Sequence, residues 1–210
     1  MFSAKDIIVI IVSYLLGCFA TGYYLVRLRT GEDIRSRGSG AVGARNVGRE
    51  LGAPGFVLTF LVDFTKGALA VWAATYFGLS PWGVILSMHA VIIGHIWPAQ
   101  LGFRGGKGIA TALGALMAFD YRLAVILILL FGFIWVLVRE LTLSGLVAIS
   151  MAPLVAAIMA KSHRDAAGIT LLVILILMAH RTNIRDMIRT MRNRRNEREM
   201  KPAAPRGLQQ

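Results

Sequence analysis

The chain has 210 residues, of which 56% are hydrophobic and only 16% are charged. With a mean hydropathy of +0.64, this composition excludes a water-soluble domain and predicts an integral membrane protein. Lys and Arg number 23 against 11 Asp and Glu, which gives a net charge of +12. In a membrane chain this excess is typical of cytoplasmic loops and of contacts with anionic membrane lipids, so we expect no nucleic-acid partner.

Seven apolar runs predict an all-α integral membrane protein, a bundle of seven transmembrane helices. The first run carries no charge, and a helix of its length covers about 30 Å, the thickness of the bilayer hydrocarbon. The fourth and seventh runs are shorter than the ~17 residues of a full span, so we expect them to be tilted, buried by neighbours or partly re-entrant. The runs are 7–26, 53–78, 82–103, 107–119, 123–138, 141–160 and 167–180.

Loop charge predicts the topology. When the seven spans alternate sides, 18 of the 23 Lys and Arg fall on one face. The positive-inside rule makes that face cytoplasmic, with the N-terminus outside and the C-terminus in the cytoplasm. We expect one transmembrane domain over 1–185 and a basic cytoplasmic tail over 186–210, first an amphipathic helix on anionic lipid and then disordered beyond Met200.

The first cytoplasmic loop combines glycines, hydroxyls and arginines. Glycines allow close backbone approach and arginines pair with anions, so the loop predicts a phosphate cradle. Its spacing also matches a dinucleotide fingerprint, but no strand precedes it and no βαβ unit can be built, so we reject that interpretation. The candidate substrate-binding residues here are Gly38, Gly40, Gly43, Asn46 and Arg49, together with Ser39 as a candidate catalytic residue.

Two opposite charges lie within the second apolar run. Asp63 and Lys66 are one helical turn apart, and charges inside a membrane are costly unless they are paired. We expect a structural ion pair rather than direct chemistry.

The second glycine cluster surrounds one lysine. Gly105, Gly106 and Gly108 bracket Lys107 where an apolar run resumes, so backbone N–H groups and an ammonium could converge on an anion near a helix start. A strict nucleotide P-loop is excluded, because Leu101 stands where its first glycine is required. Three glycines inside the apolar runs, by contrast, favour close helix packing: Gly94, Gly114 and Gly132.

A third polar cluster ends the last apolar run on the same face. His180 and Asn183 are three residues apart, so they lie on one side of a helix and can hydrogen-bond a hydroxyl or a phosphate. Thr142 adds a hydroxyl on this face. No residue pattern indicates a metal ion or a cofactor, so we expect neither.

Four strings in this order resemble the bacterial acyl-phosphate-dependent glycerol-3-phosphate acyltransferases, the PlsY family: GSGAVGARNVGR, DFTKG, GHIWPAQLGFRGGKGIAT and HRTNIR. The resemblance implies a seven-helix bundle in the bacterial inner membrane with its active site facing the cytoplasm. It also implies transfer of an acyl group from acyl phosphate to the sn-1 hydroxyl of glycerol 3-phosphate, giving lysophosphatidic acid. A soluble enzyme that forms acyl phosphate is the implied functional partner.

Carried over by motif position, the resemblance implies that five residues bind phosphate or polarise the reacting groups: Ser39, Arg49, Lys107, His180 and Asn183. Three positions depart from the family pattern, which has Asn at Ala41, Thr at Arg45 and commonly Ser at Thr142.

Two other functions compete with the acyltransferase hypothesis. A transporter or channel for an organic phosphate would need similar anion sites, although transporters place them at the midplane between inverted repeats, and no repeat is visible here. A non-catalytic lipid-binding scaffold explains the basic tail but gives Lys107 no role.

Overall fold

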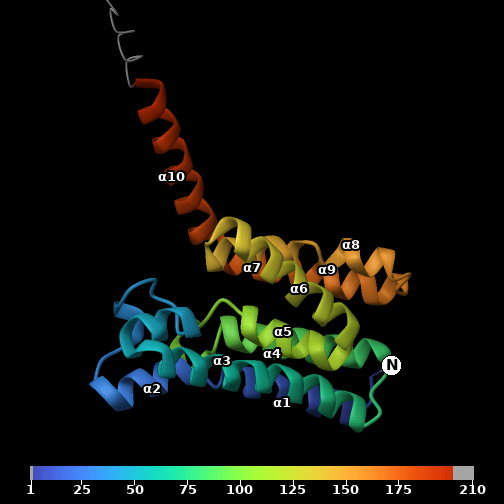
Figure 1. The fold of residues 1–210 in the computed structure, drawn as a ribbon. Coiled ribbons are helices and arrows are strands. Elements are labelled where there is room, and N and C mark those ends of the chain that lie inside the picture. Colours follow the sequence, from blue (N-terminus) through green and yellow to red (C-terminus); the bar gives the residue numbers. More distant parts are fainter. Residues whose placement is uncertain (1, 201–210) are drawn as a thin grey trace, which may run out of the picture. The chain divides into compact units, whose positions relative to one another are not determined.

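The computed structural model describes residues 2–200, and all regular secondary structure within them is helical. The expected disordered end beyond Met200 lies outside these residues. The α-helices are α1 Ala4–Cys18, α2 Thr21–Thr30, α3 Ala44–Tyr76, α4 Pro81–Ile96, α5 Ile109–Phe119, α6 Tyr121–Val138, α7 Leu141–Ser150, α8 Ala152–Ile158, α9 His163–Ala179 and α10 Arg181–Met200, with short 3₁₀ helices η1 Ile34–Ser36 and η2 Ala99–Leu101 (Figure 1).

The chain divides into two units, Met1–Ala179 and His180–Gln210. The first unit contains α1 to α9, and the second contains α10. The division expected from composition, between 185 and 186, stays a prediction.

Five helical segments of the described chain are long and apolar enough to cross a membrane. The number of candidate spans rises to six if α9 and the start of α10 are counted as one span with a break. The fourth and seventh apolar runs, which were expected to be short, correspond to α5 with 11 residues and α9 with 17 residues. The protein is therefore a multi-pass helical membrane protein, while seven spans and the orientation of the termini stay predictions.

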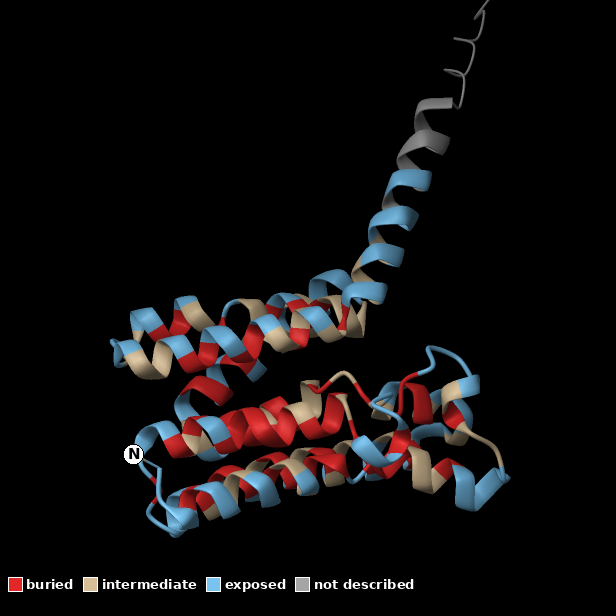
Figure 2. Ribbon diagram, turned by 180° about the vertical axis from the view of Figure 1, so that it is seen from behind, coloured by how far each residue is buried: buried red, intermediate tan, exposed pale blue. Residues whose placement is uncertain are grey.

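Glycines allow two pairs of helices in the first unit to pack closely. A Cβ atom at Gly114 of α5 would overlap the backbone carbonyl of Phe64 in α3, and one at Gly94 of α4 would overlap that of Tyr14 in α1. Buried residues accordingly gather on α4 and α5 (Figure 2). Gly132 of α6 differs from our expectation, because a Cβ atom there would meet nothing within 4 Å.

A kink divides α3 near its start. Gly52 has φ 71° and ψ −167°, a left-handed conformation that suits glycine, and Pro54 follows inside the helix. The residues before Gly52 therefore form a short helical segment directly after the first glycine-rich loop. This segment carries Asn46 and Arg49.

Candidate active site

One buried amide organises the first glycine-rich loop. The Asn46 side chain, only 3% exposed, donates to the carbonyls of Arg37 and Ala41 at 3.0 Å and to that of Ile34 at 3.3 Å. Its Oδ1 accepts from the backbone N–H of Ser39 at 3.0 Å. Both ends of the amide are thus engaged with the loop, so Asn46 acts on this site through the loop backbone.

The exposed part of the loop presents the residues expected to bind phosphate. Gly38 and Gly40 have φ of 52° and 69°, the left-handed region that glycine adopts without strain. A Cβ atom at Gly38 would overlap Asn46 Oδ1 and lie 3.7 Å from Arg49 Nη1. Ser39 and Arg49 are both exposed. The Arg49 guanidinium therefore lies close to the tight backbone turn that carries Ser39.

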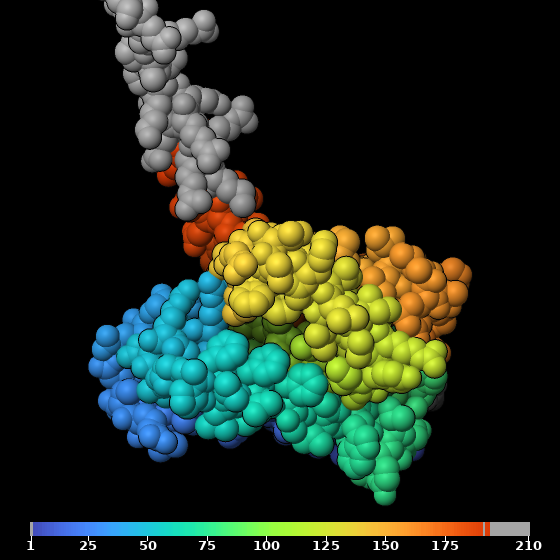
Figure 3. Space-filling model, viewed as in Figure 1, coloured from blue at the N-terminus to red at the C-terminus, as the bar shows by residue number. Residues whose placement is uncertain are grey.

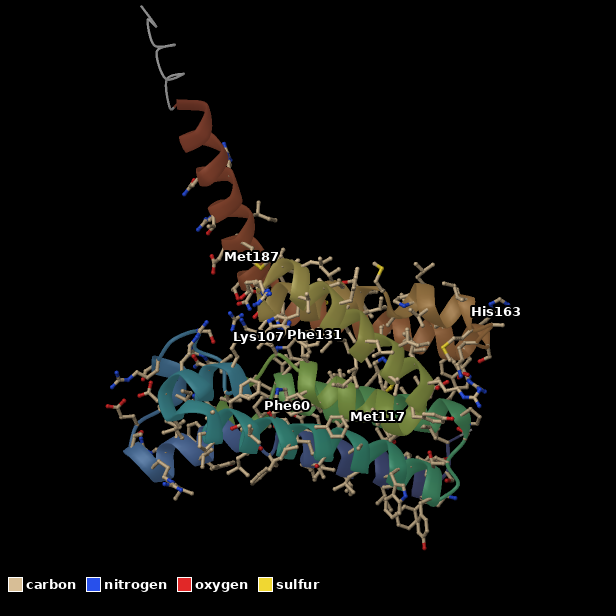
Figure 4. All side chains as sticks on the ribbon, viewed as in Figure 1. Phe60, Lys107, Met117, Phe131, His163 and Met187 are labelled. Atoms are coloured by element: carbon tan, nitrogen blue, oxygen red, sulfur yellow. The ribbon has the colours of Figure 1, made fainter. Side chains whose placement is uncertain are left out.

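The second glycine-rich loop folds back on the end of α4. The N–H of Gly106 donates to the carbonyl of His95 at 2.9 Å, and that of Gly105 donates to Ile96 at 3.1 Å. Gly108, with φ 84°, is the N-cap residue of α5, which begins at Ile109. Lys107 is half-buried and directly precedes this helix start, where the helix dipole favours an anion. Figure 4 shows Lys107 beside the start of α5.

Hydrogen bonds join the two loops. The N–H of Val42 donates to Gly105 at 3.4 Å, and Arg35 Nη1 donates to the carbonyl of Leu101 at 2.7 Å. Asp33 holds the same guanidinium at 2.7 Å. The Arg35 hydrogen bonds lower the pKa of Asp33 below its ordinary value, so its carboxylate is ionised at neutral pH. The first two sequence clusters therefore lie at the same end of the first unit.

A charged network lies buried next to this end. Lys66 Nζ is 2.8 Å from Asp63 Oδ1, donates to the carbonyl of Phe19 at 2.8 Å and lies 2.8 Å from His95 Nδ1. Thr21 Oγ1 donates to Asp63 at 3.3 Å. The ion pair thus connects α3 to α4 and to the break between α1 and α2. His95 was missed as a site residue, although it lies in the GHIWPAQLGFRGGKGIAT string.

Thr142 contacts the first loop region through Arg45. The Arg45 guanidinium donates to the hydroxyl of Thr142 and lies 2.5 Å from Glu140 Oε1. Two of the three departures from the family pattern are therefore in contact with each other, and they connect the start of α3 with the start of α7.

The third sequence cluster belongs to the second unit. His180 is buried, at 3% exposed, and Asn183 is half-buried in the first turn of α10. Their convergence with the two glycine-rich loops stays a prediction.

A cavity of about 450 Å³ lies between α1 and α3, away from these loops. Its walls are apolar, and Lys5 at the start of α1 lines it. The surface is also hollowed between α3 and α7 (Figure 3). Among residues 2–200 the structure contains no group of three or more His, Cys, Asp or Glu able to hold a metal ion.

Together, these features define a multi-pass helical membrane protein whose two basic, glycine-rich loops meet at one end. Residues 7–190 match the family model described as glycerol-3-phosphate acyltransferase. The chain belongs to this family.

Relatives and solved structures agree with this assignment. The chain is 50% identical to glycerol-3-phosphate acyltransferase 1 of Desulfitobacterium hafniense, over 90% of this chain and 94% of the relative. It is 38% identical to the Bacillus cereus protein of the same name, over 86% of this chain and 100% of the relative. The crystal structure of PlsY, an integral membrane glycerol 3-phosphate acyltransferase, in its glycerol 3-phosphate form is 33% identical with a TM-score of 0.84, over 89% of this chain and 94% of that one. Its lysophosphatidic acid form is 31% identical with a TM-score of 0.80, over 89% and 93%.

Proposed function

We propose that this protein transfers a fatty acyl group from acyl phosphate to the sn-1 hydroxyl of glycerol 3-phosphate. The products are lysophosphatidic acid and inorganic phosphate. The observation that carries the proposal is the joining of two glycine-rich loops, by the Val42–Gly105 and Arg35–Leu101 hydrogen bonds, next to Lys107 at the start of α5. Family membership supplies the class of reaction.

The chemistry needs no covalent enzyme intermediate, because acyl phosphate is an activated mixed anhydride. The sn-1 oxygen attacks the acyl carbonyl carbon, the bond from that carbon to the phosphate oxygen breaks, and phosphate leaves. Lys107 and the N–H groups of its flanking glycines neutralise charge on the tetrahedral oxyanion or on the departing phosphate. Ser39, Arg49 and Asn183 hold glycerol 3-phosphate for the attack.

The proton of the attacking hydroxyl has two possible acceptors, a phosphate oxygen of the donor and His180. We favour the donor phosphate, because it is released together with the proton. A His180→Gln variant tests this choice. If it binds substrate normally but loses several orders of magnitude in kcat, with wild-type activity following the titration of a histidine, His180 is the base.

The location of the reaction follows from the charge distribution. The two loops and the start of α3 carry Arg35, Arg37, Arg45, Arg49, Arg104 and Lys107, and the positive-inside rule predicts that they lie on the cytoplasmic side of a bacterial inner membrane. Seven spans with the N-terminus outside satisfy this placement, with α5 and α9 as the short ones. A soluble acyl-phosphate-forming enzyme would then deliver the donor from the cytoplasm, and the arginines of α10 would contact anionic membrane lipids.

The deciding experiment measures lysophosphatidate formation by the purified protein. Glycerol 3-phosphate is offered with acyl phosphate, acyl-CoA or acyl carrier protein in parallel, so that only the leaving group changes. We expect product from acyl phosphate alone. Lys107→Ala should abolish it, and Arg104→Ala, which removes an exposed cation from the same loop, should not. No product from any donor, with uptake of labelled glycerol phosphate into sealed vesicles, would favour a transporter.

A further inference from the structure

The imidazole of His95 forms the surface on which Gly106 rests. A Cβ atom added to Gly106 would overlap the Nε2 atom of His95, with the ring's Cε1 and Cδ2 at 2.6 and 2.9 Å. The three atoms nearest to that added atom all belong to this ring. Because the backbone N–H of Gly106 also donates to the carbonyl of His95, the position of this one residue determines where the turn before Lys107 lies.

The opposite edge of the ring is held by the buried ion pair. An ammonium group has three donors and no acceptor, and Lys66 Nζ has three acceptors within 2.8 Å: the carbonyl of Phe19, Asp63 Oδ1 and His95 Nδ1. His95 Nδ1 thus lies between the two charges, 2.8 Å from Lys66 Nζ and 3.5 Å from Asp63 Oδ1, and the opposite ring nitrogen, Nε2, faces Gly106. The ion pair thus fixes the orientation of the ring.

We propose that His95 is a positioning residue for Lys107. Asp63 and Lys66 fix its ring, the ring supports Gly106, and the turn at Gly106 holds the ammonium of Lys107 where negative charge develops. This inference rests on the proposed acyl transfer and assigns the buried network to it.

Packing alone does not account for this arrangement. Replacing a buried ion pair by apolar side chains is often neutral or stabilising, and charges inside a membrane are expensive. Here the Asp63–Lys66 pair of α3 contacts both α2 and α4, and the imidazole of His95 in α4 contacts the second glycine-rich loop.

His89 provides a natural comparison on the same helix. It is as buried as His95, at 4% exposed. Its Nδ1 contacts the carbonyl of Ile85 in its own helix at 2.7 Å, and its Nε2 has no hydrogen-bond partner among the described residues. Burial of a histidine in α4 therefore does not require contact with a charge pair or with the glycine-rich loop.

The first test compares His95→Gln with His89→Gln in the acyl-phosphate assay. A displacement of about 1 Å can cost roughly 100-fold in rate, so we expect His95→Gln to lower kcat by about 10- to 100-fold. The KM for glycerol 3-phosphate should change by less than about threefold, because Ser39 lies in the other loop and Arg49 lies at the start of α3. His89→Gln should leave kcat unchanged. Equal kcat values for the two variants would overturn the proposal.

The second test uses the contact between ring and glycine. Gly106→Ala should lower kcat, because the new methyl group pushes the loop away from the ring. In a His95→Ala background the methyl group has room, so the double variant should lose no more than His95→Ala alone. Losses that multiply would show that the two residues act independently and would overturn the proposal. If the His95 variants do not fold, Gly106→Ala decides alone, since it leaves the ion pair intact and an unchanged kcat would refute the proposed contact.

Wild type and His89→Gln separate this inference from the proposed function. If neither forms lysophosphatidate from acyl phosphate, the proposed function fails. If both are active and the His95 variants match them, only the positioning role fails.

Discussion

Replacing Asn46 by Ala should release the first glycine-rich loop without removing a group that touches substrate. The substitution deletes three hydrogen bonds to carbonyls and one from the Ser39 N–H. Two of those carbonyls, of Ile34 and Ala41, accept in buried positions. At about 1–3 kcal/mol for each buried group left unsatisfied, local opening of the loop should become easier by roughly 2–6 kcal/mol.

Two measurements check this magnitude. Hydrogen exchange of the amides in residues 36–42 should accelerate. If substrate binding must reorder the loop, kcat/KM for glycerol 3-phosphate should also fall, by roughly 30-fold for 2 kcal/mol. Asn193→Ala, at an exposed position of α10, is the control and should change neither quantity. Unchanged exchange together with kcat/KM within threefold of wild type would refute the reasoning.

Asn46→Asp separates the two ends of the amide. It keeps an acceptor for the Ser39 N–H but places a carboxylate against the three carbonyls that the amide nitrogen now serves. Because a carboxylate cannot donate, this variant should be at least as impaired as Asn46→Ala. A nearly normal Asn46→Asp protein would mean that the Ser39 bond alone orders the loop.

Three further predictions concern the scaffold. Lys66→Met should lower stability by about 3–5 kcal/mol because it leaves the Asp63 carboxylate buried and unpaired, and adding Asp63→Asn should recover most of the thermal unfolding midpoint in detergent. Gly114→Leu should prevent close packing of α5 on α3, whereas Gly132→Leu, which projects into open space, should be tolerated in the same unfolding measurement. The pKa of Asp33 is lowered in the folded state, so the stability that it contributes is present above its ordinary pKa of 3.8 and is lost as the pH falls below that value. The protection factors of the joined loops against hydrogen exchange, taken relative to an unfolded chain at the same pH, should fall in that acid range and stay constant from about pH 5 to 8.

Local patterns were enough to predict apolar helices and the two loops, but not the breaks that divide the run 7–26 between α1 and α2 and the run 141–160 between α7 and α8. Apolar runs of bilayer length, the glycines around Lys107 and the helical spacing of Asp63 and Lys66 are all visible along the chain. The kink at Gly52 was not predicted, since one glycine among apolar residues does not disclose its left-handed conformation. Gly132 illustrates the same limit, because composition cannot tell which helix face meets a neighbour.

His95 shows why the rest of the site could be identified only from the three-dimensional structure. A single histidine in an apolar run has the same local pattern as His89, and the two residues are equally buried. They differ in the contacts of their rings. The His95 ring contacts Lys66 of α3 and Gly106 of the second glycine-rich loop, whereas Nδ1 of His89 contacts the carbonyl of Ile85 in its own helix. The contact between Lys66 and His95 joins residues that are 29 positions apart in the sequence. The spacing of apolar residues along the chain does not predict such a tertiary contact.

Tertiary contacts also explain two of the departures from the family pattern, Arg45 and Thr142. Arg45 is one of these departures, and its guanidinium contacts Glu140 and Thr142 at the start of α7. Partial burial raises the pKa of Glu140, but the hydrogen bonds from the N–H of Leu143 and from the Arg45 guanidinium together lower it by more. The net effect is a pKa below the ordinary value. The carboxylate is therefore ionised at neutral pH and can hold Arg45 there. Because the loop itself is ordered by Asn46, a change at position 45 alters how α3 is tied to α7 and leaves the hydrogen bonds of the cradle intact.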